Sequence, residues 1–283
     1  MSLPFASAGI DVTYYPVTHS SEGVKQSITA ALNCDLILVM GYFGMSDAPS
    51  IPSSYKGVVI EDLTHSLFSS CRCNRADYTF GSLRKWCGVW TGGFAWKRDH
   101  AVFDVAPAPA NQHYVATRKH AMEEKSAYIS SGEGGKNYLV SFNNAEEWLD
   151  GHASVMQADV RDVLLAHQID AESIRGARRS NAEVLLSNLD SSPCVKPVFS
   201  ELDAGDCPLF VPVLLEQRDS LRRYLIEHEV YCPVHWPVSA MHVLDDETSV
   251  FYKQGLSLVC DQRYGADGML RICDLVKEWQ KIS

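Results

Sequence analysis

Residues 58–96, VVIEDLTHSLFSSCRCNRADYTFGSLRKWCGVWTGGFAW, contain two short apolar runs that each end in polar or ionisable side chains. The first run ends in two acids, the second of which is Asp62, and His65 follows three residues later. The second run ends just before Ser82 and Lys85. Continuous apolar runs of this length are typical of strands buried on both faces of a parallel sheet. Because ligands bind beyond the carboxyl ends of such strands, the segment predicts a ligand site.

Similar patterns recur on both sides of this segment. Strands are predicted over residues 12–17, 35–40, 55–62, 78–80, 92–96, 208–215 and 256–259. Helices are predicted over residues 23–32, 145–156, 174–189, 218–228 and 268–280, with no strand between 111 and 189. The sequence therefore predicts an α/β protein with a mostly parallel sheet flanked by helices, followed by a small C-terminal α+β domain. The expected boundaries are 1–106 for a partial large domain, 107–193 for a helical linker region and 194–283 for the small domain.

Composition narrows the possible partners and location. The formal net charge of -10 argues against binding to nucleic acid or to an anionic membrane surface. No apolar stretch approaches the roughly 20 residues that a membrane span needs. The N-terminus shows no signal-peptide pattern, so the nine cysteines are predicted to be reduced thiols of a cytoplasmic protein.

Two other motifs were weighed and give weaker predictions. Cys71 and Cys73 form the only close cysteine pair, and a zinc site usually needs two such pairs, so no metal site is predicted. Residues 82–85, SLRK, match the S-x-x-K nucleophile motif of penicillin-binding enzymes, but neither S-D-N nor K-T-G occurs in the chain. Taken singly, an aspartate after a strand is often a solvated turn residue or a helix cap. The order Asp, His, Ser, Lys at consecutive strand ends favours a functional site.

The stretch VVIEDLTHSL…ADYTFGSLRKWCGVWTGG resembles the core of the fold-type-I pyridoxal-phosphate enzymes. It is most similar to the DegT/DnrJ/EryC1 family of sugar and amino-acid aminotransferases. The segments DLILVMGYFG, RGARRSNAEVLLSNL and LSLVCDQRY resemble other parts of that family, so the likeness extends over nearly the whole chain. The resemblance implies that residues 1–106 belong to the cofactor-binding large domain.

Each site residue is carried over from the family motif by position. Lys85 matches the lysine that forms the internal aldimine with pyridoxal phosphate, and Asp62 matches the carboxylate that pairs with the pyridine nitrogen. Ser82 matches a hydroxyl that contacts the phosphate. His65 matches a position beside the ring and its phenolic oxygen, and Thr64 matches a small residue on the ring face.

These roles agree with the chemistry that the cofactor requires. A carboxylate beside the pyridine nitrogen keeps it protonated, so that the ring acts as an electron sink. A lysine must be neutral to add to an aldehyde, and its amine can then move a proton at the substrate Cα. Tyr42, after the 35–40 strand, and Arg263 are predicted to contact the substrate; for Arg263 an ion pair with Asp261 is an equally good interpretation.

The resemblance implies a homodimeric aminotransferase acting on a small-molecule amino donor and a keto acid or keto sugar acceptor. Two alternatives are a pyridoxal-phosphate-dependent lyase and a non-catalytic or truncated protein of the same fold that acts as a binding module. Two features depart from the family. The sequence lacks the preceding segment that carries the phosphate-binding turn and the ring-stacking aromatic residue, so weak cofactor binding is expected, and Gly41 stands where a polar residue is common.

Overall fold

The computed structural model describes residues 2–46, 48–106, 108–132, 135–152, 156–189, 192–236, 238, 244 and 246–282. The chain divides into two compact units. We call Met1–Val12 with Ser82–Ile169 the helical unit, and Thr13–Gly81 with Asp170–Ser283 the sheet unit. The boundaries expected at residues 106/107 and 193/194 remain a prediction, and residue 107 itself lies outside the described residues.

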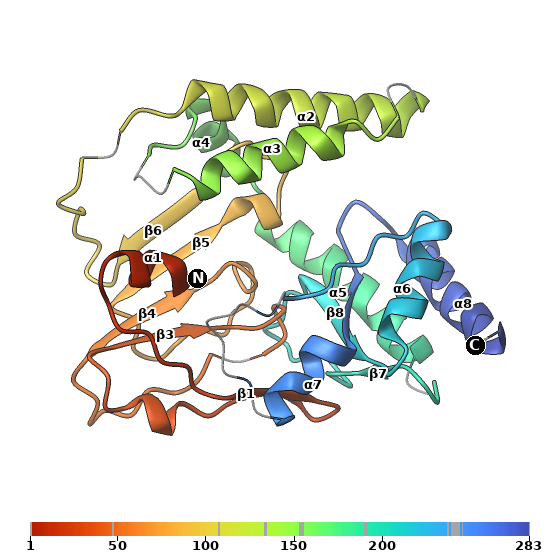
Figure 1. Ribbon diagram of the computed structural model, residues 1–283, viewed down its shortest axis with the longest axis horizontal. Helices are drawn as coiled ribbons and strands as arrows, with labels where there is room; N and C mark the ends of the chain where they lie inside the picture. The colour runs from red at the N-terminus through yellow and green to blue at the C-terminus, as the bar shows by residue number, and fades with distance from the viewer. Residues whose placement is uncertain are drawn as a thin grey trace. The chain divides into compact units, whose positions relative to one another are not determined.

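Parallel strands form the first part of the sheet unit (Figure 1). β3 (Leu36–Met40) pairs in parallel with β4 (Val58–Asp62), which pairs in parallel with β5 (Tyr78–Ser82). In this register Met40 lies opposite Asp62, and Asp62 lies opposite Phe80. The carboxyl ends of the strands therefore lie level, as the sequence predicts, and the predicted α/β class with a mostly parallel sheet is confirmed.

An antiparallel sheet and four helices form the C-terminal part of the same unit. The sheet has the order β7 (Lys196–Pro197), β8 (Phe210–Leu214) and β9 (Gly255–Val259). The helices are α5 (Ala171–Leu189), α6 (Arg218–Glu227), α7 (Asp246–Gln254) and α8 (Ala266–Ile282). One apolar core joins α5, α6 and α8 to the sheet, with fully buried side chains that include Leu185, Val213, Leu221, Leu258 and Val276. The predicted C-terminal α+β architecture agrees with these elements.

The segment before β3 differs from the prediction. Residues 23–32 were predicted to be a helix, and this prediction is wrong. Gly23 has φ +105° and ends a tight turn, so β1 (Val17–Ser20) pairs antiparallel with β2 (Gly23–Gln26). Only a short 3-10 turn, η1 (Ile28–Ala31), follows. Residues 12–16 are not part of a strand, and β1 starts directly after Pro16, whose ring nitrogen cannot donate to a ladder.

The loop after β3 is fixed to the segment that leads into β8. Leu209 N donates to Phe43 O at 2.7 Å, and Cys207 N donates to Gly44 O at 3.1 Å. Gly44 has φ +74°, and a Cβ there would overlap with the carbonyl oxygen of Cys207. Only glycine fits this close approach of two backbone segments. The loop that carries Tyr42 is thereby held in one place within the sheet unit.

The helical unit contains α1 (Ser2–Ser7), the 3-10 turn η2 (Leu83–Lys85), β6 (Gly93–Lys97), α2 (Gln112–Ser131), α3 (Tyr138–Asp150) and α4 (Val160–Ala166). Asn111 caps the N-terminus of α2, and its side chain accepts from Tyr114 N at 2.9 Å. α2 and α3 lie side by side (Figure 1). The helix predicted over residues 145–156 overlaps α3, which ends at Asp150, and residues 153–155 of that range lie outside the described residues. Among the described residues, no helix combines the length and apolar character needed to cross a membrane.

Candidate functional site

Asp62 ends β4 as a buried carboxyl group. Its side chain is 3% exposed, and Thr64 N donates to its Oδ1 at 2.8 Å. Burial raises the pKa of Asp62, and the hydrogen bonds from Thr64 oppose this rise only in part. A buried carboxyl group of this kind fits a cationic nitrogen, because a positive charge beside it would stabilise the ionised form. Asp62 therefore suits the predicted role beside a protonated pyridine ring.

Glu61, the acid before Asp62, has a structural role. It is as buried as Asp62, but its Oε1 accepts a hydrogen bond from Cys73 N at 2.7 Å. Burial raises the pKa of Glu61 as well, and the bond from Cys73 and the charge of Arg72 oppose the rise. Adjacent residues on a strand point to opposite faces, so Glu61 and Asp62 meet different surroundings. Substitution of Glu61 is therefore a matched control for substitution of Asp62.

Tyr42 and His65 lie in an aromatic cluster of the sheet unit. His65 is 3% exposed, and its ring stacks on Trp236 with centroids 5.4 Å apart and an interplanar angle of 20°. Tyr42 meets Trp236 edge-on with centroids 5.7 Å apart. Burial is the main cause that raises the pKa of the Tyr42 phenol. The structure therefore brings Tyr42 and His65 to one tryptophan and Thr64 to Asp62.

Gly41, where the family often has a polar side chain, sits against the loop after β4. A Cβ at Gly41 would lie 2.8 Å from Ser66 Oγ and 3.0 Å from Ser66 Cβ. A larger residue would require Ser66 to move. Glycine at this position, where the family often has a polar side chain, therefore allows the loop after β3 and the loop after β4 to pack closely.

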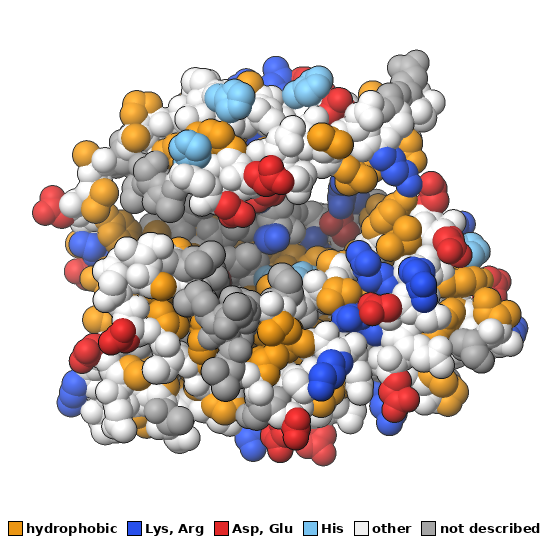
Figure 2. All heavy atoms as spheres, viewed as in Figure 1, with side chains coloured by type: hydrophobic (Ala, Val, Ile, Leu, Met, Phe, Trp, Pro, Cys, Tyr) orange, Lys and Arg blue, Asp and Glu red, His pale blue; other side chains and the backbone are white. Residues whose placement is uncertain are grey.

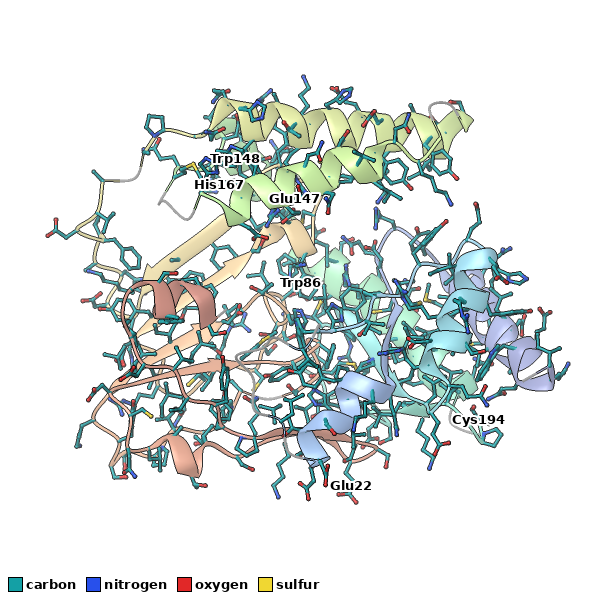
Figure 3. The ribbon with its side chains drawn as sticks, in the orientation of Figure 1. Glu22, Trp86, Glu147, Trp148, His167 and Cys194 are labelled. Atoms are coloured by element: carbon teal, nitrogen blue, oxygen red, sulfur yellow. The ribbon has the colours of Figure 1, made fainter. Side chains whose placement is uncertain are left out.

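Ser82 and Lys85 belong to the helical unit. Ser82 has extended backbone and precedes η2, which is closed by hydrogen bonds from Trp86 N and Cys87 N to Leu83 O at 2.9 and 2.8 Å. Trp86 is 2% exposed and serves as a core residue (Figure 3). Its burial fixes the turn, while Lys85 remains exposed in this chain.

The amine of Lys85 has a pKa below its ordinary value. Desolvation by surrounding protein atoms is the largest cause, and the like charges of Arg84 and Arg118 act in the same direction. The carboxylate of Glu146 opposes them. Although the side chain has access to solvent, the protein atoms around it still disfavour the ammonium form. The neutral amine is the form that adds to an aldehyde.

The structure pairs Arg263 with Asp261. Arg263 Nε and Nη2 donate to Asp261 Oδ1 and Oδ2 at 2.8 and 3.0 Å, and the Arg263 side chain is 63% exposed. The two-pronged ion pair is the alternative that the sequence left open, although it is exposed rather than buried. The substrate-binding role of Arg263 therefore remains a prediction.

Sequence reasoning missed several charged residues that the fold brings together. Arg84 and Arg118 both form ion pairs with Glu146, at 2.7 and 2.9 Å. Arg178, with a side chain 1% exposed, donates to Pro208 O and Leu209 O at 3.1 and 2.9 Å and so anchors α5. No sequence signal pairs residues so far apart in the chain.

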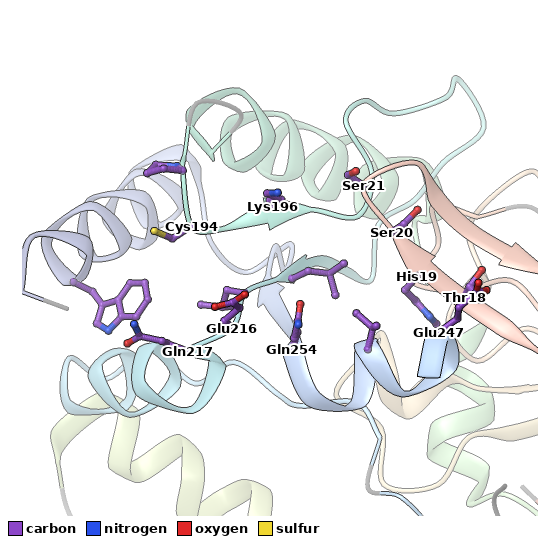
Figure 4. A pocket seen from close by; sticks show the side chains of 15 residues that line it. Thr18, His19, Ser20, Ser21, Cys194, Lys196, Glu216, Gln217, Glu247 and Gln254 are labelled. Atoms are coloured by element: carbon purple, nitrogen blue, oxygen red, sulfur yellow. The ribbon is translucent and has the colours of Figure 1, made fainter. Parts of the chain in front are cut away.

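A cavity in the sheet unit lies away from these residues. It has a volume of about 720 Å³, and Figure 4 shows Cys194 and Lys196 on one side and Glu216 and Gln254 on the other. None of the predicted site residues lines it. Within the described ranges, no group of three His, Cys, Asp or Glu side chains could hold a metal ion.

Comparisons with known proteins identify the fold. No protein-family model and no curated protein matches the sequence. The aminotransferase TlmJ from Streptoalloteichus hindustanus matches with a TM-score of 0.65 and 14% identity, over 99% of this chain and 76% of that one. Helicobacter pylori PseC, an aminotransferase involved in the biosynthesis of pseudoaminic acid, matches with a TM-score of 0.64 and 13% identity, over 100% and 77% of the two chains.

A third similar structure carries the family name that the sequence resembles. A DegT DnrJ EryC1 StrS aminotransferase from Brucella abortus matches with a TM-score of 0.57 and 13% identity, over 96% of this chain and 74% of that one. At these identities the likeness concerns the fold, and it extends over nearly all of the chain. The protein therefore has the fold of the fold-type-I pyridoxal-phosphate aminotransferases, as its sequence predicts.

Proposed function

We propose that the protein is a pyridoxal-phosphate-dependent aminotransferase that moves an amino group between an amino acid and a keto acid or keto sugar. The observation that carries the proposal is the buried carboxyl group of Asp62 at the end of β4, in a fold shared with aminotransferases. Bound pyridoxal phosphate would supply an electron sink for the bonds at the substrate Cα. The residues of the chain would bind the cofactor, keep its ring nitrogen protonated and move the proton at the substrate Cα.

Asp62 would hold the proton on the ring nitrogen, since an ionised carboxylate raises the pKa of a neighbouring cationic acid. Thr64 fixes the Asp62 carboxyl group through its backbone N–H and would border the ring together with His65. Ser82 would donate a hydrogen bond to the phosphate. Tyr42, which follows the end of β3, would contact the substrate.

Lys85 would carry the covalent bond to the cofactor aldehyde and later move a proton at the substrate Cα. Its lowered pKa supports both tasks, because a neutral amine is needed as nucleophile and as base. Arg263 would reach a substrate carboxylate only by leaving Asp261, which now occupies two of its donor groups. The structure therefore gives the role of Arg263 less support than the other proposed roles.

The test is trapping of the cofactor on one lysine. The protein is incubated with pyridoxal phosphate, reduced with borohydride and digested, and the modified peptide is identified by mass spectrometry. We expect the adduct on Lys85, with loss of the visible absorbance band in Lys85→Ala. Lys97→Ala is the matched control, because Lys97 is a lysine of β6 whose amine donates to Val102 O at 3.1 Å and lies over the Phe103 ring. An adduct spread over surface lysines, or an unchanged Lys85→Ala spectrum, would reject the proposal.

We also propose a cytoplasmic homodimer. None of the nine cysteines, all of which lie in the described ranges, is paired in a disulfide, which is the state expected in a reducing compartment. Basic and acidic side chains are interspersed on the face shown in Figure 2, and with the net charge of -10 this supports small molecules rather than nucleic acid as partners. Sedimentation analysis with and without pyridoxal phosphate tests the dimer, and a monomer under both conditions would contradict it.

A turnover assay separates the alternatives. Once trapping has shown that Lys85 binds the cofactor, a mixture of amino acids and keto acids is offered to the unreduced protein with pyridoxal phosphate, and the products are identified. Exchange of the amino group supports the aminotransferase. Loss of a small leaving group would indicate a lyase, and binding without turnover would indicate a binding module.

A further inference from the structure

The indole ring of Trp236 contacts two side chains that the sequence assigns to the candidate site. It stacks on the His65 imidazole, with centroids 5.4 Å apart and an interplanar angle of 20°. It also meets the Tyr42 ring edge-on, with centroids 5.7 Å apart and an angle of 80°. The sequence gives Trp236 no role, because no local pattern joins it to residues so far before it in the chain.

The plane of the His65 ring depends on the groups packed around it. The torsion that turns an imidazole about its bond to Cβ is broad and roughly two-fold, so this torsion alone does not choose the plane. Besides Trp236, two rings of the described residues pack against His65. Phe43 is tilted at 48° with centroids 5.7 Å apart, and His235 is edge-on at 71° with centroids 5.4 Å apart. Two of these three rings therefore come from the adjacent residues His235 and Trp236.

The segment that carries these two rings is fixed to β9. Ser257 N donates to Pro233 O at 3.0 Å, and the Ser257 hydroxyl shares a hydrogen bond of 2.9 Å with His235 Nδ1. Ser257 is fully buried in the middle of β9, which pairs with β8. Phe210, at the start of β8, meets the His235 ring with centroids 5.1 Å apart. The antiparallel sheet therefore holds the rings that border His65, while His65 itself follows a strand of the parallel sheet.

We propose that Trp236 is a positioning residue that fixes the ring plane of His65, and that Ser257 holds Trp236 in place through His235. The proposal rests on the function proposed above, in which His65 borders the cofactor ring. It gives the C-terminal antiparallel sheet a part in building a site whose predicted contacts to the cofactor ring follow a strand of the parallel sheet.

A fixed ring plane matters for the role given to His65. An imidazole forms hydrogen bonds through its two ring nitrogens, roughly in the plane of the ring. If the ring turned, neither nitrogen would keep its direction toward a group of the cofactor. A ring that turns freely must also lose that freedom when the cofactor binds, and this loss weakens binding. The stacked indole removes the loss beforehand, because a large flat neighbour fills the space into which the imidazole would turn.

The first measurement needs no cofactor. Histidine ring signals are recorded by NMR on the full chain with labelled histidines, and the His65 signals are assigned by their absence in His65→Gln. We expect Trp236→Leu to shift and broaden the His65 signals, because the ring current of the indole is lost and the imidazole samples more than one plane. Trp236→Phe keeps a flat ring and should keep the signals narrow.

Trp279→Phe is the matched control for the loss of an indole in the same unit. Trp279 is 3% exposed, lies in the apolar core that joins α5, α6 and α8 to the sheet, and donates to Ser220 Oγ at 3.1 Å. This variant should lower stability and leave the His65 signals in place. Ser257→Ala, which removes the hydroxyl that His235 shares, should broaden the His65 signals less than Trp236→Leu does.

The second measurement asks whether Trp236 acts through His65. The dissociation constant of pyridoxal phosphate is titrated for the wild type, Trp236→Leu, His65→Ala and the double variant. We expect Trp236→Leu to bind about tenfold more weakly. The double variant should bind as His65→Ala does, because the positioning residue then has no ring to position. A purely structural role would instead give additive losses.

Three results would overturn the role of Trp236: unchanged His65 signals in Trp236→Leu, an equal change in Trp279→Phe, or additive losses in the double variant. Unchanged His65 signals in Ser257→Ala would overturn the role of Ser257. A wild-type chain that does not bind pyridoxal phosphate would refute the proposed function instead, and the His65 signals would still decide whether Trp236 fixes the ring.

Discussion

Replacing Gly44 by alanine tests whether the loop after β3 is held by close backbone contact. A Cβ at Gly44 would overlap with the Cys207 carbonyl oxygen and would lie 2.9 Å from the Cys207 carbonyl carbon and 3.0 Å from His65 O. All three obstacles are backbone atoms, which cannot rotate away as a side chain can. The loop must therefore move, and it carries Tyr42 on one side of the glycine.

The structure gives the size of the effect. Gly44 has φ +74°, and the left-handed conformation costs an alanine about 1–2 kcal/mol. Gly44 O accepts from Cys207 N at 3.1 Å and from Ser69 Oγ at 2.9 Å, and a displaced loop loses both bonds at about 1 kcal/mol each. We therefore expect Gly44→Ala to lower the free energy of unfolding by about 3–4 kcal/mol.

Gly23→Ala is the matched control in the same unit. Gly23 also has a positive φ, +105°, but its Cβ would meet only the Phe199 ring, at 3.7 Å, which is an ordinary contact. The loss of unfolded-state entropy is the same for both substitutions, so it cancels in the comparison. Urea unfolding followed by far-ultraviolet circular dichroism measures both variants, and we expect Gly44→Ala to be less stable than Gly23→Ala by about 2 kcal/mol. Equal stabilities would refute the reasoning from backbone overlap.

Two further predictions concern buried ionisable groups. Asp62→Asn keeps an acceptor for Thr64 N but removes the charge, so we expect turnover with pyridoxal phosphate to fall by roughly two orders of magnitude or more. Glu61→Gln, the neighbouring acid that binds Cys73 N, should change stability and leave turnover within about threefold, and equal losses of turnover in both variants would remove Asp62 from the site. His19 is 8% exposed and stacks on Phe251, and burial lowers its pKa from 6.5 to about 4. The unfolded chain then binds the extra proton first as the pH falls, so the contribution of His19 to stability should drop by about 3 kcal/mol between pH 6.5 and 4 and be constant above that window. His19→Phe should remove that part of the slope of unfolding free energy against pH, and an unchanged slope would show that His19 is not protected in the fold.

The sequence by itself determined the elements whose pattern is local. Continuous apolar runs predict buried parallel strands, and both the strands and the class of fold are confirmed. Because parallel strands end at one edge of a sheet, the position of Asp62 after its run was enough to place it at a strand end. The resemblance around Lys85 added the expected fold, which the structural comparisons bear out.

The sequence pattern gave a wrong prediction at residues 23–32, where the backbone conformation of one glycine decides between helix and strand. Apolar residues within 23–32 are compatible with a helix, but the turn at Gly23 with φ +105° makes β1 and β2 pair instead. Periodicity alone cannot separate these outcomes over so short a segment. The pairing partner lies within ten residues, yet only the folded chain selects it.

Only the tertiary structure decided which charges meet. Two adjacent acids in the sequence have different partners in the fold, since Glu61 binds Cys73 N and Asp62 binds Thr64 N. Arg84 and Glu146 are 62 positions apart and share a hydrogen bond of 2.7 Å. No local preference predicts such a pair, because the energy of a charge depends on distance and burial, and both are set only when the turn that carries Arg84 and the helix α3 come together in the folded chain. The sequence therefore specifies where the reactive groups stand along the strands, and the packing of distant helices specifies the charge that surrounds them.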